Sequence, residues 1–144
     1  MMMRFGTPPE AGRQYKMRPG AYAILPRSGQ LLLTEQAPGP EIQLPGGGID
    51  PGEHPIAALH REVFEETGWR IGRITRLGAY RRFTYMPEYD LWAEKLCHIY
   101  CAAPVFQLAS PPEPDHRALW LPIEQAVEKL ENTGDAAFVQ KYCS

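Results

Sequence analysis

The chain has 144 residues, of which 44% are hydrophobic and 22% charged, and its formal net charge at pH 7 is −2. That length suits one domain with a single core. The balanced charge excludes a protein dominated by a basic surface for nucleic acid or membrane. No apolar run approaches the ~20 residues that span a bilayer, and the N-terminus lacks the apolar stretch of a secretory signal. The 3 cysteines lack CxxC spacing and predict reduced thiols in a cytoplasmic protein.

The first half of the chain predicts two strands and a long loop. Residues 1–17 are rich in glycine and proline and predict a flexible tail, with one domain over 18–144. Ranges 21–25 and 30–34 predict a hairpin. Prolines and glycines then predict a long loop over 38–52, broken briefly near 42–44. Loops of this length in compact domains tend to be functional.

A helix is predicted over 54–67, because Pro55 suits a first turn and Gly68 suits a C-terminal cap. Strands on both sides of this helix favour a mixed sheet with helices on its faces. The remaining expected elements are strands at 69–77, 79–85, 91–102 and 117–121, a β-bulge at Gly78, a proline-rich loop at 104–115, and helices at 122–130 and 135–142.

The helix carries its charges and its apolar residues on separate stripes. At 100° per residue, Glu62, Glu65 and Glu66 gather within roughly 100° of arc, apart from the apolar stripe of Ile56, Leu59 and Val63. Carboxylates at these spacings repel one another, and the C-terminal half of a helix disfavours anions. Arg61 neutralises only part of this charge. A divalent cation is the simplest further compensation, and all-oxygen ligands indicate Mg²⁺, Mn²⁺ or Ca²⁺.

The segment before the helix offers a site for phosphate. Gly46, Gly47, Gly48 and Gly52 allow the backbone to approach a ligand closely, and Glu53 stands beside the helix start. A glycine-rich turn that enters a helix is a common phosphate site. Phosphate, carboxylates and a divalent cation form a recurring set, in which the metal neutralises phosphate charge and activates water.

These residues resemble a known motif. Gly47, Glu53, the run Arg61-Glu62-Val63-Phe64-Glu65-Glu66-Thr67-Gly68 and Trp69 follow the Nudix box, G-x5-E-x7-R-E-U-x-E-E-x-G-U. Trp69 departs from the usual aliphatic residue but is still large and apolar. The resemblance implies an α/β fold, namely a Nudix-type α/β/α sandwich around a mixed β-sheet.

The resemblance also implies an activity. Nudix enzymes hydrolyse a pyrophosphate bond in a nucleoside diphosphate linked to another moiety, with Mg²⁺ as cofactor and Mn²⁺ as a substitute. By position, Glu62 and Glu66 match the principal metal ligands, and Glu65 a further ligand or base. Gly46 would offer a backbone carbonyl to the metal, while Arg61 and Glu53 would orient the glutamates and support catalysis. Many members add an acid from a late loop, for which the candidates are Glu88, Asp90, Glu94, Glu113 and Asp115.

The substrate is less well defined. Gly47 and Gly48 are expected to bind phosphate, and Arg81 and Tyr85 could hold phosphate and stack a base, although the arginines could equally be solvated. Tyr85 lies 16 residues past Trp69, as in enzymes that cleave diadenosine polyphosphates, and Pro87 lies 18 past it, as in ADP-ribose enzymes. These substrates are slightly favoured over oxidised nucleoside triphosphates.

Two further classes of function stay open. The domain could sense a nucleotide without turnover, although a sensor needs no complete glutamate set. An isomerase on the same fold would need an additional proton-transfer pair. The expected partner is a small nucleotide, with no membrane and no dedicated nucleic-acid surface, and the chain could form a homodimer.

Overall fold

The computed structural model describes residues 2–37, 39 and 41–143, so Pro38 and Pro40 of the expected loop lie outside it. One sheet has five strands in the order β1-β7-β8-β2-β6. It is mixed, because β1–β7 and β2–β8 pair in parallel and the other pairs are antiparallel. Its strands are β1 (Met3–Arg4), β2 (Lys16–Ile24), β6 (Gly46–Gly48), β7 (Trp69–Met86) and β8 (Leu91–Gln107).

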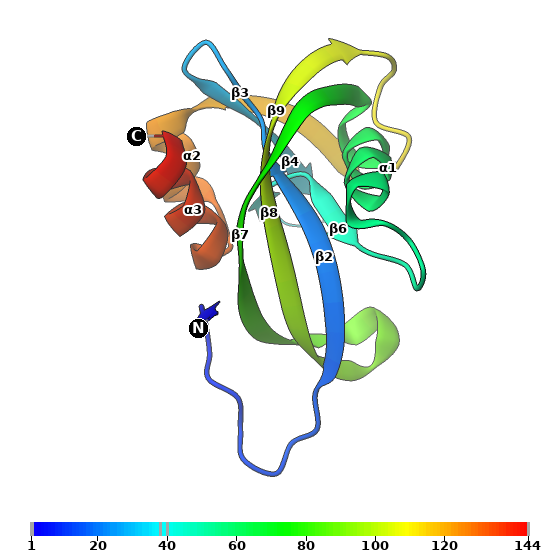
Figure 1. The fold of residues 1–144 in the computed structure, drawn as a ribbon, viewed down its shortest axis with the longest axis vertical. Coiled ribbons are helices and arrows are strands. Elements are labelled where there is room, and N and C mark those ends of the chain that lie inside the picture. The colour runs from blue at the N-terminus through cyan, green and yellow to red at the C-terminus, as the bar shows by residue number, and fades with distance from the viewer. Residues whose placement is uncertain (1, 38, 40, 144) are drawn as a thin grey trace.

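A second, four-stranded sheet contains β3 (Pro26–Arg27), β4 (Gln30–Gln36), β5 (Glu41–Gln43) and β9 (His116–Pro122). The helices are α1 (Pro55–Thr67), α2 (Ile123–Lys129) and α3 (Thr133–Cys143), and a 3-10 turn, η1 (Pro87–Tyr89), joins β7 to β8. Figure 1 shows α1 on one side of the strands and α2 and α3 on the other. Within the described residues, no helix combines the length and apolar character that crossing a membrane requires.

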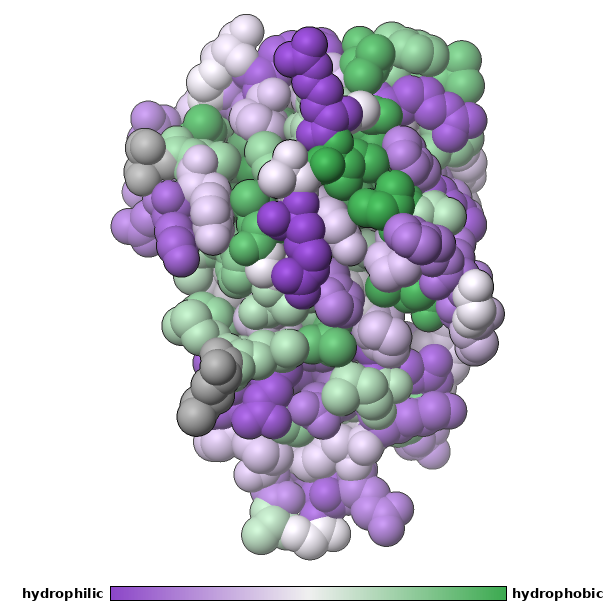
Figure 2. All heavy atoms as spheres, viewed as in Figure 1, coloured by the Kyte–Doolittle hydropathy of each residue, from purple (hydrophilic) through white to green (hydrophobic). Residues whose placement is uncertain are grey.

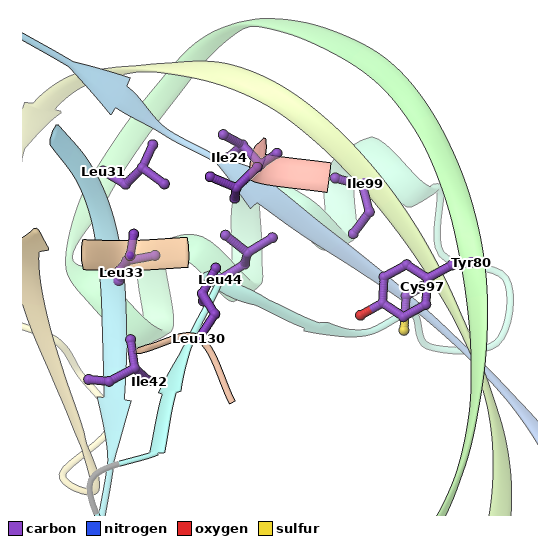
Figure 3. Close-up of a cluster of buried hydrophobic side chains, with 11 residues drawn as sticks. Ile24, Leu31, Leu33, Ile42, Leu44, Tyr80, Cys97, Ile99 and Leu130 are labelled. Carbon is purple, nitrogen blue, oxygen red and sulfur yellow. The ribbon is translucent and has the colours of Figure 1, made fainter. Parts of the chain in front are cut away.

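Alternate strand residues build the two cores of this sandwich. Ala23, Leu25 and Leu32 pack in one buried cluster with Leu59 and Val63 of α1. The intervening residues face the other way and pack with α2 and α3; the buried members of that cluster are Ile24, Leu31, Leu33, Ile42, Leu44, Tyr80, Cys97, Ile99, Ala126, Leu130 and Val139 (Figure 3). The expected α/β/α sandwich is therefore confirmed, with Leu59 and Val63 fully buried and Ile56 packed partly against them.

The expected helix is confirmed to within one residue. His54 caps it, since its side-chain Nδ1 accepts a hydrogen bond from the Ile56 N–H at 3.1 Å. Gly68 ends it in the left-handed conformation, with φ 77°, and its N–H donates to the Phe64 carbonyl at 2.8 Å. The bulge expected at Gly78 is also present, as a register shift between Arg76 and Gly78.

The hairpin expected from 21–25 and 30–34 is only partly present. The turn exists, but it joins β3 to β4, whereas β2 pairs with β6 and β8 in the other sheet. The chain changes sheets at Pro26, which has no N–H to continue a ladder. Strand β6 occupies part of the expected loop, because glycines 46–48 pair with Gly20, Ala21 and Tyr22.

Strand β8 continues to Gln107 and so takes up the start of the loop expected over 104–115. Pairing with β2 ends at Cys101, so beyond this residue β8 has β7 alone as a neighbour in the sheet. An edge of this kind tolerates Pro104. Exposed apolar side chains gather past it, at Val105, Phe106 and Leu108, and Figure 2 shows hydrophobic side chains over the upper half of the molecule.

The segment 1–17, expected to be a flexible tail, contacts the domain, and its last two residues, Lys16 and Met17, begin β2 and pair with β8. Met3 and Arg4 pair with β7, and the Phe5 ring packs edge-on against Tyr80 with ring centroids 5.3 Å apart. Tyr15 packs edge-on against Phe83 at 4.8 Å. The flexibility of this segment stays a prediction.

Candidate metal and phosphate site

Helix α1 presents its carboxylates to the glycine strand β6. The Gly46 N–H donates to Glu66 Oε1 at 3.0 Å, and Glu66 is only 8% exposed. A side chain at Gly47 would overlap the Glu62 carboxylate, and one at Gly46, whose φ is 150°, would overlap the Ala21 carbonyl. Gly47 therefore lets the strand lie directly against Glu62, while Gly46 lets it approach β2 closely.

Arg61 ties the loop to the helix. Its guanidinium donates to Glu53 through Nε (2.9 Å) and Nη2 (2.8 Å), to Glu62 Oε1 through Nη1 (2.8 Å), and to the Gly48 carbonyl through Nη2 (3.1 Å). Glu53 is fixed further, because its Oε1 accepts from the Asp50 N–H at 3.0 Å. These contacts suit the orienting role expected of Arg61 and Glu53.

The ionisation of these groups follows from their partners. The hydrogen bond from Arg61 lowers the pKa of Glu53 to about 2, and the same bond raises the pKa of Arg61. Burial has the opposite effect on the helix carboxyls: it raises the pKa of Glu62, and it raises that of Glu66 well above the ordinary value. Neighbouring carboxylates push both values further in the same direction. The centre is therefore short of positive charge.

The loop before β9 adds another acid. The Glu113 N–H donates to the Glu65 carbonyl at 3.2 Å, which brings Glu113 over the end of α1. Ligand atoms of Glu62, Glu65 and Glu113 lie within 4.8 Å of one another. The other late-loop candidates lie in other contacts: Glu94 pairs with Arg81, Asp90 accepts from Tyr85, and Asp115 lines the cavity beside the centre. Glu88 has no recorded side-chain bond among the described residues.

His116 joins this centre although the sequence did not single it out. Its Nε2 lies 3.1 Å from Glu113 Oε2 and 3.7 Å from Glu66 Oε2, and its side chain is only 7% exposed. Its Nδ1 is buried without a hydrogen-bond partner. Glu66, Glu113 and His116 form a second group whose ligand atoms lie within 4.8 Å of one another. The sequence signals His116 only by its spacing of three residues from Glu113, and this spacing is common in any loop.

The donor set fits a divalent cation. Glu62, Glu65, Glu66 and Glu113 offer carboxylate oxygens, which Mg²⁺ and Mn²⁺ prefer, and His116 offers one nitrogen. A solvent-open cavity of about 330 Å³ lies beside the centre; its lining residues are Glu35, Ala37, Gly39, Pro114, Asp115, His116 and Arg117. Space for a bound molecule thus adjoins the acidic cluster.

Arg81 and Tyr85, the expected substrate residues, lie along β7 towards the turn at η1. Figure 1 places this turn at the lower end of β7 and β8, below α1. Arg81 pairs with Glu94 at 3.3 Å, and the Tyr85 hydroxyl donates to Asp90. The Tyr85 ring is 39% exposed and lies against Trp92, with centroids 5.2 Å apart. The structure records no contact between these side chains and the acidic cluster within the described part of the chain.

Comparison with known proteins identifies a matching family and several relatives. A family model described as "NUDIX domain" matches residues 15–142. A Bacillus subtilis protein named as an 8-oxo-dGTP diphosphatase is 39% identical over 74 residues, which cover 51% of this chain and 50% of that protein. An RNA pyrophosphohydrolase of Azorhizobium caulinodans is 43% identical over 63 residues, or 39% of this chain and 36% of that protein. The chain thus spans half or less of the length of these relatives.

The fold also has relatives among solved structures. A NUDIX hydrolase from Nitrosomonas europaea superposes with a TM-score of 0.63 at 27% identity, over 79% of this chain and 78% of that one.

Proposed function

The chain belongs to the NUDIX domain family, and from this premise we propose that it is a divalent-metal-dependent pyrophosphohydrolase of small nucleotides. One observation carries the proposal: Glu62, Glu65, Glu66 and Glu113 converge beside the glycine strand β6, with Arg61 fixed between loop and helix. This arrangement combines a cation site with a backbone that can approach phosphate closely.

The residues of the chain divide the work in this proposal. Glu62 and Glu66, with Glu65, hold Mg²⁺, or Mn²⁺ in its place, and the Gly46 carbonyl adds a ligand. Held there, the cation would offset the negative charge of the pyrophosphate and act as a Lewis acid on it. Gly47 and Gly48 leave room for the phosphates, while Arg61 and Glu53 keep Glu62 in position.

We propose that Glu113 is the general base, which accepts a proton from the attacking water. Its carboxylate adjoins those of Glu62 and Glu65, and its side chain is 39% exposed, so water can reach it. His116 lies against Glu113 at 3.1 Å and limits the orientations of its carboxylate. The expected alternative base, Glu65, lies in the same group.

Two substrate classes are supported by different observations. The relatives named for 8-oxo-dGTP and for RNA pyrophosphate hydrolysis favour a substrate with a 5′-triphosphate end. The exposed Tyr85–Trp92 pair favours an adenine dinucleotide such as a diadenosine polyphosphate or ADP-ribose, since stacking contributes ~1–3 kcal/mol per base. The triphosphate class is the better supported, because it rests on sequence identity to named relatives.

The test is turnover of a panel of compounds in Mg²⁺ and in EDTA, measured by chromatographic separation of the nucleotide products. A triphosphate releases phosphate or pyrophosphate, whereas a dinucleotide is split into two phosphorylated fragments. The panel is an oxidised deoxyguanosine triphosphate, a 5′-triphosphorylated oligoribonucleotide, diadenosine tetraphosphate, ADP-ribose, NADH and coenzyme A. We expect Mg²⁺-dependent turnover with a triphosphate leading. A dinucleotide that leads and loses its advantage in Tyr85→Ala would favour the second class. Tight nucleotide binding with no turnover of any compound would contradict the hydrolase and favour the sensor.

A further inference from the structure

Three basic side chains stand side by side across three strands. Lys95 of β8 is the register partner of Arg82 on β7 and of Arg18 on β2. Residues two positions further along these strands, Tyr80 and Cys97, are buried in the core cluster that packs against α3. Because side chains alternate along a strand, Arg18, Lys95 and Arg82 face the same side, opposite α1. We call these three residues the basic row.

The basic row lacks the counter-charges expected of like charges so placed. None of its members pairs with a carboxylate within 4.0 Å among the described residues. The Nε atoms of Arg18 and Arg82 are buried and have no hydrogen-bond partner. Like charges directly opposite one another destabilise a sheet, so an anion bound here would relieve both the repulsion and the unused donors.

The surroundings compensate this charge only in part. Asp135 is near enough to influence Lys95 and Arg82 electrostatically, and Glu88 influences Lys95, yet neither carboxylate bonds to the basic row. Asp135 is instead bonded to the Tyr80 hydroxyl at 2.6 Å. The guanidinium of Arg18 lies over the Tyr89 ring, 5.0 Å from its centroid. All three basic residues are half-buried.

The glycine strand β6 runs close to the basic row. Gly20, two residues after Arg18 on the same face of β2, pairs with Gly48. A side chain at Gly20 would meet the Tyr22 hydroxyl at 2.9 Å and the Gly47 carbonyl at 3.0 Å. The candidate phosphate strand is therefore the direct neighbour of β2 at this level of the sheet. A ligand with several phosphates could lie along that edge.

We propose that Arg18, Lys95 and Arg82 form an anion site for a phosphate group, distinct from the acidic centre on α1. Guanidinium groups bind phosphate through paired, charge-assisted hydrogen bonds, and the Lys95 ammonium adds a point charge between them. The phosphate comes either from a distal part of the nucleotide substrate or from a separate phosphorylated molecule. Phosphate binding at the basic row does not require hydrolysis. The anion site can therefore be tested independently of the proposed activity.

The first test is calorimetric titration of the full chain with inorganic tripolyphosphate in EDTA, which removes any metal-held phosphate at the acidic centre. We expect saturable binding, weakened at least about tenfold by Lys95→Gln or Arg82→Gln. Arg82→Lys should weaken binding less than Arg82→Gln, because it keeps the charge but loses the paired hydrogen bonds. Arg76→Gln, an exposed arginine on the same strand, is the matched control and should bind normally. Circular dichroism checks that each variant is folded.

Two outcomes would overturn the proposal. One is the absence of saturable tripolyphosphate binding to the folded wild-type chain. The other is an equal loss of tripolyphosphate affinity in Arg76→Gln, which would show that binding depends only on the overall charge of the protein.

A second measurement distinguishes the two sources of phosphate. In the Mg²⁺ assay, competitive inhibition by tripolyphosphate, with KM raised and kcat unchanged in Lys95→Gln, would mark the phosphate as part of the substrate. Inhibition or activation that does not compete with substrate, and that disappears in Lys95→Gln, would mark a separate ligand. Both results support the site, whereas kinetics of Lys95→Gln identical to wild type, with and without tripolyphosphate, would contradict it.

Discussion

Arg61 donates two hydrogen bonds to Glu53, from Nε to Oε2 at 2.9 Å and from Nη2 to Oε1 at 2.8 Å. The pairing joins the loop before α1 to the helix itself. Because Arg61 also donates to Glu62 and to the Gly48 carbonyl, one guanidinium sets the relative positions of the metal and phosphate sites. Arg61 is thus a positioning residue in the proposed reaction.

Arg61→Lys should lower kcat/KM by roughly 10–100-fold, the usual range for residues that orient metal ligands. Lysine keeps the charge but cannot form the forked contact with Glu53 and still reach Glu62. Steady-state kinetics over a range of Mg²⁺ concentrations checks this, with Arg76→Lys, at an exposed arginine on β7, as the matched control. Wild-type kinetics in Arg61→Lys would show that charge alone suffices.

Glu62→Gln and Glu66→Gln should each remove most of the activity while leaving the fold intact. The side chains are isosteric, and the amide oxygen introduced by Glu66→Gln could still accept the Gly46 N–H. Losing a metal ligand that is worth about 3 kcal/mol in the transition state lowers the rate roughly a hundredfold. Glu128→Gln on α2 is the control, since it lies outside the acidic centre. Full activity in either site variant would refute the ligand assignment.

Mg²⁺ should stabilise the folded chain. A ligand that binds the folded state alone, present at a hundredfold excess over Kd, adds about 2.7 kcal/mol to the free energy of unfolding. Here it also relieves repulsion between Glu62, Glu66 and Glu113, whose raised pKa values reflect burial and crowding. Urea denaturation with Mg²⁺, against NaCl of equal ionic strength, measures this effect. Stabilisation of equal size in Glu66→Gln would place the metal elsewhere.

Gly47→Ala should damage the site more than the fold. The added methyl group overlaps the carboxylate of Glu62, which is the movable end of a flexible side chain, so Glu62 is displaced while the backbone stays in place. Activity should fall sharply, with little change in thermal stability. Gly48→Ala meets no atom within 4 Å and should cost less, unless the phosphates need that space. Equal activity in Gly47→Ala and wild type would show that Glu62 need not stay where it lies.

Asp135 should make stability depend on pH. Burial raises its pKa to about 6 from 3.8, so between these values the folded state holds a proton that the unfolded state has lost. Stability therefore falls as pH rises through this window, by at most about 3 kcal/mol. Asp135→Asn should flatten that decline. Urea denaturation at pH 4, 5, 6 and 7 in EDTA compares the slopes, and parallel curves for the two proteins would contradict the assignment.

Local features of this molecule could be predicted and long-range ones could not. The helix over 54–67 and the placement of Glu62 beside Glu66 follow from spacing and caps along one segment. The parallel pairing of Lys16 with Ala93 leaves no local pattern, so the sequence predicts that β2 pairs with its neighbour along the chain. For the same reason Glu113 is one of five candidate acids: the loop that brings it to Glu65 joins β8 to β9, two strands far from α1 in the sequence.

The parallel pairing of β2 with β8 implies an order of folding. Strands β7 and β8 adjoin across η1 and can form their hairpin early, because that closes a short loop. Strand β2 has to close a far longer loop before it reaches β8, and such contacts form slowly. Strand β6 pairs with β2 and carries the Gly46 N–H that binds Glu66. We therefore expect the acidic centre to be completed late in folding, after β2 has made its long-range pairing with β8.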